Sequence, residues 1–260
     1  MGGARRKPAW VVQKERNGRT PPDRVWLFGL HAVEAALRNP ARTRHRLLVT
    51  RNAADRLAEA IAAADIAPEE ADARRFPAPL DPASVHQGAA LEVSPLDWGS
   101  VSERCAPGMG TPRVVLLDRV SDPQNVGAVL RSAEVFGARA VIAPHRHAAP
   151  ETGALAKAAS GALERQAYLR VPNLASAMQA LKQMGYAIIG LDGTADTPLD
   201  AATAQHRGRP LALALGAEGP GLRELTRKTC DVLANIPAAG GFGSLNVSNA
   251  AAVALYAARD

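Results

Sequence analysis

The sequence has few aromatic residues and no long apolar run. Phe, Trp and Tyr make up 4% of its 260 positions and hydrophobic residues as a whole 47%, so Ala, Val, Leu and Ile must build most of any core. No stretch reaches the roughly 18 apolar residues that a membrane-spanning helix needs, and we expect no transmembrane segment. The opening residues MGGARRKPAW are charged but have no apolar core, so they do not match a secretory signal.

Cysteine is scarce as well. The two cysteines, Cys105 and Cys230, have neither metal-binding nor redox spacing. We interpret them as buried or incidental thiols of a protein in the reducing cytoplasm. The sequence offers no cluster of His, Cys and carboxylate residues, so we predict no metal site.

Positive charge is in excess, and most of the excess lies at the N-terminus. The formal net charge is +6, and residues 1–23 hold six basic against two acidic residues. Together with its Gly and Pro content, this predicts a disordered basic tail. Such a tail can bind a polyphosphate backbone by releasing counterions. It can equally be a solubilising extension, and charge alone does not separate the two.

The composition divides the chain into two folded parts. Residues 24–98 alternate predicted strands (25–28, 46–49, 71–76 and 89–93) with helices after Gly29 and over about 53–64, which indicates a small α/β domain. Residues 99–111 (GSVSERCAPGMGT) are rich in Gly, Ser and Pro without periodicity and are predicted to be a linker. Residues 112–260 form the second domain.

The second domain repeats a strand–helix pattern. Several of its strands are almost continuously apolar, as expected when both faces of a parallel sheet are covered. We therefore predict an α/β fold with helices on both sides of a parallel sheet. The expected strands are 113–117, 140–143, 168–171, 187–191, 210–215 and 232–236, and the expected helices are 126–136, 155–162, 174–184, 222–228 and 247–258.

Three polar or Gly-rich loops follow strands of this sheet, at 118–137, 216–222 and 236–256. Ligands of open parallel sheets bind at the carboxyl ends of the strands. In GAEGPGL (216–222), three glycines allow a close backbone approach, but Glu218 and the lack of Lys disfavour a phosphate. A neutral or cationic ligand fits better. The alternative is a tight turn with Glu218 near a helix N-terminus.

The other two loops carry polar clusters. Ser244, Asn246, Ser248 and Asn249 precede an apolar helix, and four polar residues exceed what helix capping requires. Asn125 can cap its own helix. Arg131 lies six residues further on, about 120° away around a helix, and by itself would be read as a solvated or salt-bridged surface residue.

The segments DPQNVGAVLRSAEVFG, LALGAEGPGL and IPAAGGFGSLNVSNAAAVALY resemble, in this order, the three motifs of the SpoU/TrmH methyltransferases of the SPOUT class. The resemblance covers about 112–260. Upstream, GLHAVEAALRN, LLVTRN and VHQGAALEV resemble the substrate-binding domain of many members, and both domains together resemble the branch that methylates guanosine in 23S ribosomal RNA. The resemblance implies transfer of a methyl group from S-adenosyl-L-methionine to an RNA ribose 2′-hydroxyl, a deep trefoil knot in the sheet domain and a homodimer.

The resemblance also implies roles for individual residues. Arg131 matches the arginine that acts on the 2′-hydroxyl, as a base, by stabilising an alkoxide or by holding a phosphate, and in a dimer it would meet the cofactor pocket of the other subunit. The residues expected to orient it and the ribose are Asn125, Glu218, Ser244, Asn246 and Ser248. The expected cofactor-binding residues are Gly216, Ile236 and Leu245, with Leu191, Gly193, Leu215 and Ala238 as neighbours.

One departure and several alternatives accompany this reading. The run Gly240–Gly243 (GGFG) holds more glycine than the usual loop, which predicts a more mobile segment. A non-catalytic RNA-binding relative would be expected to lose Arg131, Glu218 or Asn246, and all three are present. A Rossmann enzyme needs a Gly-rich fingerprint after its first strand, where this chain reads DRVSDPQN. Transfer RNA is the second choice of substrate, and His145 and His147 are expected in an exposed loop, with RNA contact as the alternative.

Overall fold

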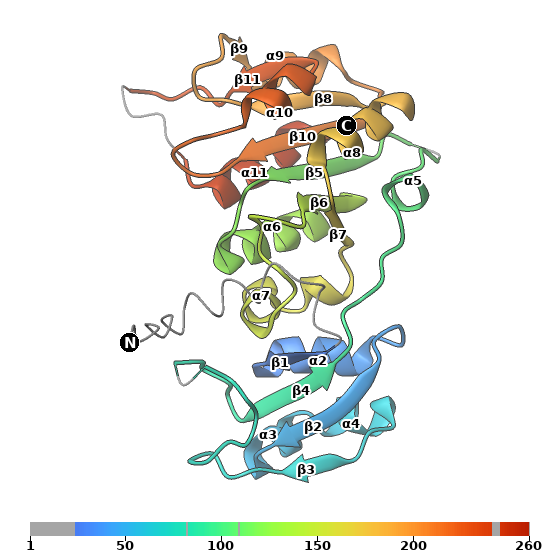
Figure 1. The fold of residues 1–260 in the computed structure, drawn as a ribbon, viewed down its shortest axis with the longest axis vertical. Helices are drawn as coiled ribbons and strands as arrows, with labels where there is room; N and C mark the ends of the chain where they lie inside the picture. Colours follow the sequence, from blue (N-terminus) through green and yellow to red (C-terminus); the bar gives the residue numbers. More distant parts are fainter. Residues whose placement is uncertain (1–23, 82, 109, 241–244, 260) are drawn as a thin grey trace, which may run out of the picture.

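The computed structural model describes residues 24–259 except 82, 109 and 241–244. The predicted disordered tail at 1–23, most of the predicted mobile glycine run and the candidate Ser244 therefore lie outside the described residues. In the described part, a small α/β domain and a larger one follow each other along the long axis of the molecule (Figure 1). Each domain has its own sheet.

The N-terminal domain has a four-stranded sheet in the order β1-β4-β2-β3. Its strands are β1 (Val25–Phe28), β2 (Arg44–Val49), β3 (Pro68–Glu70) and β4 (Ala89–Val93), and its helices are α2 (Leu30–Arg38), α3 (Arg51–Arg56) and α4 (Ala58–Ala64). The predicted strand at 71–76 is wrong. The strand in this region is β3, which ends at Glu70 and pairs with β2. After it, Asp72 accepts a hydrogen bond from the backbone N–H of Arg74 (2.8 Å), and the chain turns.

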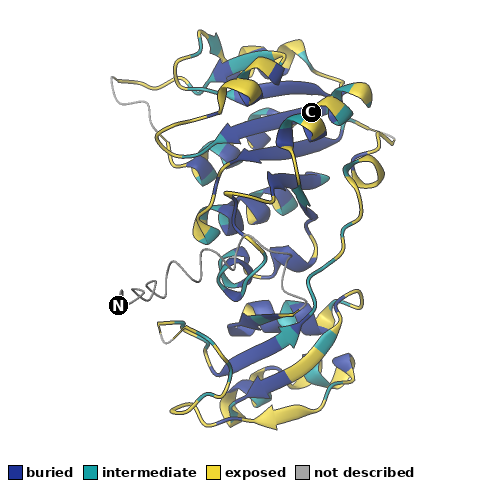
Figure 2. Cartoon of the chain, viewed as in Figure 1, coloured by how far each residue is buried: buried dark blue, intermediate teal, exposed yellow. Residues whose placement is uncertain are grey.

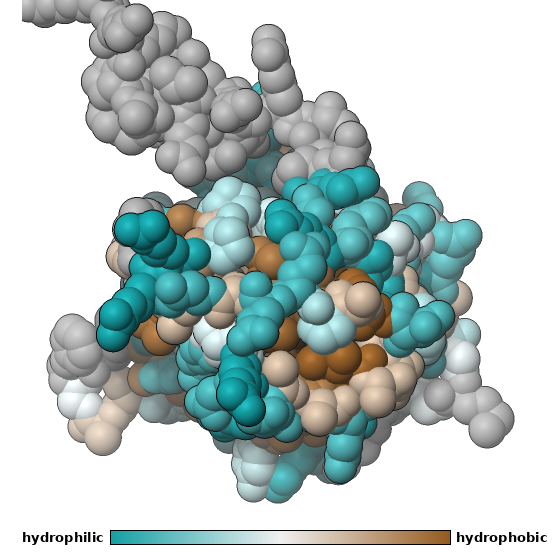
Figure 3. Space-filling model, turned by 90° about the horizontal axis from the view of Figure 1, so that it is seen from below, coloured by the Kyte–Doolittle hydropathy of each residue, from teal (hydrophilic) through white to brown (hydrophobic). Residues whose placement is uncertain are grey.

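The outer edge of this sheet is protected by charge. All three residues of β3 are exposed, and Arg46 on β2 forms a two-point pair with Glu69 at 2.7 and 2.8 Å. Proline and charged side chains discourage pairing with another strand at such an edge. Viewed from this end, the domain is covered mainly by hydrophilic residues around a smaller apolar area (Figure 3).

The segment between the domains contains one short helix, α5 (Val101–Arg104). Ser100 and Glu103 form a reciprocal capping box at its start, with Glu103 accepting from the Ser100 backbone N–H at 2.7 Å. The carboxylate form accepts these bonds, so the backbone N–H and the hydroxyl of Ser100 lower the pKa of Glu103. The predicted linker thus includes a capped helical turn.

The larger domain has a seven-stranded parallel sheet in the order β7-β6-β5-β10-β8-β11-β9. The predicted parallel sheet is confirmed, with one short edge strand, β9, that was not predicted. The strands are β5 (Arg113–Asp118), β6 (Ala140–Pro144), β7 (Tyr168–Val171), β8 (Ala187–Leu191), β9 (Thr197–Pro198), β10 (Leu211–Gly216) and β11 (Val232–Asn235).

Helices cover both faces of this sheet, as predicted. One face packs against α6 (Pro123–Val135), α7 (Gly153–Ala159), α9 (Leu199–Gln205) and α11 (Val247–Ala257), and the other against α5, α8 (Leu174–Gln183) and α10 (Glu224–Thr229). In β5, Val115 and Leu117 belong to the first core and Val114 and Leu116 to the second. This alternation explains the continuous apolar strands, which Figure 2 shows as buried.

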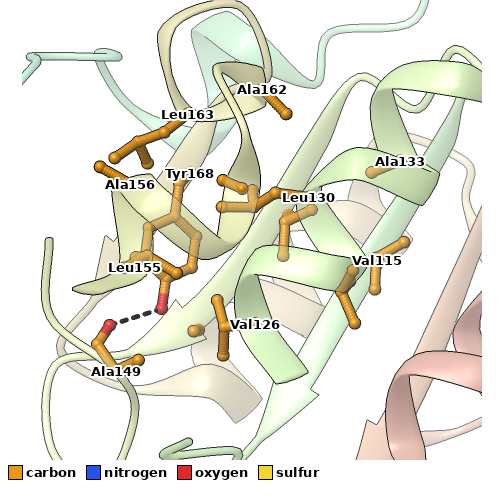
Figure 4. Close-up of a cluster of buried hydrophobic side chains, with 14 of the residues drawn as sticks. Val115, Val126, Leu130, Ala133, Ala149, Leu155, Ala156, Ala162, Leu163 and Tyr168 are labelled. Atoms are coloured by element: carbon orange, nitrogen blue, oxygen red, sulfur yellow. Dashed lines mark hydrogen bonds between the residues drawn. The ribbon is translucent and has the colours of Figure 1, made fainter. Parts of the chain in front are cut away.

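Helix α7 connects the two domains. It packs against α6 on one side and against β1 on the other. Gly127 and Gly153 permit these approaches, since a Cβ at Gly127 would lie 2.5 Å from Cβ of Ala158 and one at Gly153 would lie 2.4 Å from the carbonyl oxygen of Trp26. Figure 4 shows part of this core, with Leu130 and Val126 of α6 beside Leu155 of α7.

No helix within the described residues is long and apolar enough to cross a membrane. The two cysteines are free thiols, and Cys105 is buried. Burial raises the pKa of Cys105 to about 11 and that of Cys230 to about 12. Neither thiol is therefore a nucleophile at neutral pH. The trefoil knot stays a prediction.

Candidate active site

A cavity of about 570 Å³ opens at the carboxyl ends of β8, β10 and β11. This is the edge at which parallel sheets bind ligands. All seven residues predicted to bind the cofactor line this one cavity. They are Leu191, Gly193, Leu215, Gly216, Ile236, Ala238 and Leu245.

The glycine loop after β10 is tightly folded. A Cβ at Gly216 would lie 2.0 Å from the carbonyl carbon of Gly221, and Gly221 donates to the carbonyl oxygen of Ala217 at 2.9 Å. Gly219 and Gly221 have φ of 83° and 66°, a region that side chains disfavour. The loop is therefore a tight turn and at the same time forms a wall of the cavity.

Three polar side chains connect the three loops. The Nδ2 group of Asn246 donates to Oε1 of Glu218 at 2.5 Å and to Oδ1 of Asn125 at 2.9 Å. The Nδ2 group of Asn125 also lies 3.3 Å from the same Glu218 oxygen. We call Asn125, Glu218 and Asn246 the polar triad. It brings together residues that are up to 121 positions apart in the chain.

The capping alternatives have different outcomes. Asn246 is the N-cap of α11, and its Oδ1 accepts from the backbone N–H of Ser248 at 2.9 Å and from its hydroxyl at 2.6 Å. Asn246 therefore caps a helix and belongs to the triad as well. Asn125 does not cap α6, because Asp122 has that role. Glu218 bonds to the asparagines and precedes the start of α10 at Glu224 by six residues, so the helix-dipole alternative does not hold.

Arg131 lies apart from the triad. It is exposed on α6, six residues beyond Asn125, which is about 9 Å along a helix axis. In the part of the chain that the structure describes, its guanidinium forms no hydrogen bond or ion pair. A single chain thus gathers Asn125, Glu218, Asn246 and Ser248 but leaves Arg131 outside.

Sequence reasoning missed several polar residues at the strand ends. Asn235, the last residue of β11, lines the cavity and donates from Nδ2 to the carbonyl oxygen of Ala195 at 2.7 Å. Its Oδ1 atom is buried and has no partner among the described residues. A polar residue at the end of an otherwise apolar parallel strand is the signal that would have identified Asn235.

Two aspartates at strand ends fix the loops. Asp118, at the end of β5, is fully buried and accepts from the backbone N–H and Nε of Arg223 at 2.9 and 2.6 Å. Asp192, just after β8, pairs with Arg227 and accepts from Thr194 at 2.7 and 2.9 Å. Both arginines lie on or next to α10, so this helix braces the loops on either side of β10.

The charge of the cavity suits a cationic ligand. Its lining includes no Lys or Arg and contains two carboxylates: Asp192, which Arg227 pairs, and Glu218, which forms no ion pair among the described residues. Within the described ranges, no group of His, Cys, Asp and Glu residues can hold a metal ion. The site therefore combines apolar side chains, backbone groups and two carboxylates.

The chain belongs to the SpoU rRNA methylase family, whose model matches residues 112–256. A second model, for RNA 2′-O ribose methyltransferase substrate binding, matches residues 26–98. These matches confirm the family that the three motifs indicated.

Relatives match over nearly the whole chain. The chain is 40% identical to the 23S rRNA (guanosine-2′-O-)-methyltransferase RlmB of Ralstonia nicotianae, over 89% of this chain and 94% of the relative. It is 38% identical to the enzyme of the same name from Pseudomonas aeruginosa, over 88% and 94%.

Solved structures share the fold. The methyltransferase AviRb of Streptomyces viridochromogenes, in complex with AdoMet, is similar with a TM-score of 0.76 at 22% identity, over 96% of this chain and 97% of that one. An AdoMet-bound rRNA methyltransferase of Sinorhizobium meliloti has a TM-score of 0.74 at 21% identity, over 95% and 89%.

Proposed function

We propose that this protein transfers the methyl group of S-adenosyl-L-methionine to the 2′-hydroxyl of a guanosine in 23S ribosomal RNA, in the cytoplasm. The observation that carries the proposal is the polar triad, which joins the three motif loops beside a cavity with two carboxylates. Relatives about 40% identical over most of their length, named for this reaction, support the choice of substrate.

The residues of the cavity fit this cofactor. Its positive sulfonium suits the carboxylate of Glu218 and the absence of Lys and Arg from the lining. The unpartnered Oδ1 of Asn235 is an acceptor for an amino group. Gly216, Ile236 and Leu245 would form its walls. When bound, the cofactor supplies an electrophilic methyl group.

The protein's own work is positioning and electrostatics. The triad fixes the three loops relative to one another, so that the ribose oxygen is held close to the methyl group. The 2′-hydroxyl releases its proton to solvent as its oxygen accepts the methyl group, and Arg131 would stabilise the negative charge that develops on that oxygen.

A homodimer accounts for the isolation of Arg131. The neighbouring helices α6 and α11 expose Val135 (77%), Val253 (41%) and Tyr256 (52%), and Phe136 meets Tyr256 edge-on at 6.2 Å between ring centroids. A second copy would cover this apolar surface and bring its cavity to Arg131.

Methyl transfer to unmodified RNA tests the proposed function. Purified protein is incubated with radiolabelled S-adenosylmethionine and either 23S ribosomal RNA transcript or transfer RNA, and 2′-O-methyl sites are mapped by their resistance to alkali. We expect label on a guanosine of 23S RNA. Label on transfer RNA alone would overturn the substrate. Failure to bind the cofactor, with and without RNA, would show a non-catalytic RNA-binding relative.

A further inference from the structure

Basic side chains lie beside the candidate active site, at positions to which the proposed methyl transfer assigns no role. Arg119 follows β5, and His145, Arg146 and His147 follow β6; all four are exposed. We call these four residues the basic ridge. The carboxyl ends of β5 and β6 lie at the same edge of the sheet as the cavity, and β5 is adjacent to β10. None of the four residues lines the cavity.

Side chains of β7 hydrogen-bond to the backbone of the loop that carries His145, Arg146 and His147. Arg170 on β7 donates to the carbonyl oxygens of Pro144 (3.2 Å), Ala149 (2.9 Å) and His145 (2.5 Å). The hydroxyl of Tyr168 donates to the same Ala149 oxygen at 2.7 Å (Figure 4). Burial is the main cause that raises the pKa of Tyr168, so the hydroxyl keeps its proton as a donor. The loop is thus a built surface with fixed geometry.

A backbone hydrogen bond joins this loop to the loop after β5. The N–H of Ala149 donates to the carbonyl oxygen of Val120 at 3.3 Å, directly beyond Arg119. Arg119 and His147 have φ of 66° and 61°, which residues with a Cβ rarely adopt. Such conformations persist where the surroundings enforce them and are concentrated at functional sites.

The two arginines of the basic ridge carry free positive charge. In the described part of the chain, neither Arg119 nor Arg146 forms an ion pair or a side-chain hydrogen bond. Burial and the charge of Arg170 lower the pKa of His145, so that imidazole is neutral at neutral pH. Two full charges therefore face solvent beside the cavity, with imidazoles next to them.

The basic ridge lies between the cavity and the helix that contacts the N-terminal domain. From β5 it extends outward to β6, away from the cavity side of the sheet. The loop after β6 leads directly into α7, the helix that packs against β1 of the N-terminal domain. A chain of nucleotides that runs from the N-terminal domain to the cavity along this edge would pass over the basic ridge.

We propose that the basic ridge binds the phosphates of the RNA strand that flanks the target nucleotide. The inference rests on the proposed function, because that function makes RNA the occupant. Guanidinium groups suit phosphate oxygens through paired N–H donors, and contacts to phosphate fix the register of a nucleic acid without reading its bases. The basic ridge thereby positions the ribose at the cavity, whereas the cofactor binds at the carboxyl ends of β8, β10 and β11.

Salt-dependent RNA binding tests the proposal. The probe is unmodified 23S ribosomal RNA transcript, titrated with wild-type protein and with the double variant R119Q/R146Q over a range of KCl concentrations. Loss of two phosphate contacts is expected to weaken binding about tenfold and to reduce the magnitude of the slope of log K against log salt by about 1.4 to 1.8. The affinity for S-adenosylmethionine should not change.

The double variant R207Q/R209Q is the matched control. It removes the same charge from exposed residues just before β10, at the opposite edge of the sheet. Equal slopes for the two double variants, or a wild-type protein that binds no RNA, would overturn the proposal that the basic ridge binds RNA. Should the unusual backbone at Arg119 make its substitution harmful to folding, R146Q alone is expected to lower the slope by about 0.7 to 0.9.

The experiments distinguish a failure of the proposed function from a failure of the proposed role of the basic ridge. Wild-type protein that binds the transcript with the predicted dependence on Arg119 and Arg146 but methylates only another RNA would reject the substrate and keep the RNA-binding surface. Wild-type protein that methylates 23S RNA, with R119Q/R146Q unchanged in affinity and salt slope, would reject the basic ridge and point to an acidic protein surface as its partner.

Discussion

Arg42 and Glu164 form a buried two-point ion pair between the two domains. Nε of Arg42 donates to Oε2 of Glu164 at 3.0 Å and Nη2 donates to Oε1 at 2.6 Å. Their side chains are 0% and 2% exposed. Nη1 of Arg42 also donates to Oε1 of Glu151 at 2.6 Å and to the carbonyl oxygen of Ser94 at 2.7 Å. This cluster joins the N-terminal domain to the residues on both sides of α7, with Glu151 before the helix and Glu164 after it.

We predict that R42M strongly destabilises the protein. The substitution leaves two carboxylates buried without their cation, which costs about 3 to 5 kcal/mol in comparable cases. Urea unfolding followed by circular dichroism measures the free energy of unfolding. The control is R46M, which removes the exposed pair with Glu69 in the same domain and should change stability little. Similar losses in the two variants would contradict the prediction.

Glu151 gives the cluster a dependence on pH. Burial raises the pKa of Glu151 above its ordinary value of 4.5 although Arg42 acts in the opposite direction, and the negative charge of Glu164 adds to the rise. A carboxyl group with a raised pKa in the folded state favours folding most while it is protonated. Its contribution is complete below the unfolded pKa and is lost as pH rises through the folded pKa.

We therefore predict that E151Q becomes more stable relative to wild type as pH rises from about 4 toward neutrality. Glutamine keeps an oxygen for Arg42 and cannot ionise. The measurement is the difference in free energy of unfolding between E151Q and wild type at several pH values, which cancels the titration of distant groups. A difference that does not depend on pH, or one that turns against glutamine as pH rises, would show that Glu151 ionises without cost.

The polar triad should matter more for catalysis than for stability. In N246S, serine still caps α11, because Ser and Asn are both good N-cap residues. It loses the amide donor that reaches Glu218 and Asn125. We expect near-normal stability and a fall in kcat of about 100-fold, the size of effect that a small misplacement of reacting groups produces.

The control for this variant is N249A. Asn249 is an exposed residue of the same helix, and no hydrogen bond of its side chain is present in the described residues. Its substitution should leave kcat within about twofold of wild type, since surface changes away from specific contacts are near neutral. Equal kcat for N246S and N249A would remove the triad from the mechanism.

The sequence predicted which polar residues lie together at the candidate site better than it predicted the contacts between the domains. Asn125, Glu218 and Asn246 come together because strand ends of a parallel sheet converge, and a strand–helix pattern reveals that sheet. Arg42 meets Glu151 and Glu164 across 109 and 122 positions. No local pattern marks such a pair, since its partners are set by how α7 packs against β1.

The errors in secondary structure have a related cause. Strand β3 has three exposed residues, and it exists because it pairs with β2, so composition favoured the more apolar 71–76. Strand β9 is two residues long and is likewise defined by its partner, β11. Arg131 shows the remaining limit, because the described chain places it in solvent, apart from the polar triad.

A heterodimer of two variants tests the proposed contribution of Arg131 to the site of the partner subunit. R131A keeps the polar triad and the cavity, whereas N246S keeps Arg131. If each site combines the triad of one subunit with Arg131 of the partner subunit, a heterodimer of the two variants contains one intact site and one doubly altered site. We predict that this heterodimer, purified through two different affinity tags, has about half the activity of the wild-type dimer, while each variant homodimer stays near background. If Arg131 acts on the cavity of its own chain, every site of the heterodimer is defective, and no activity will return.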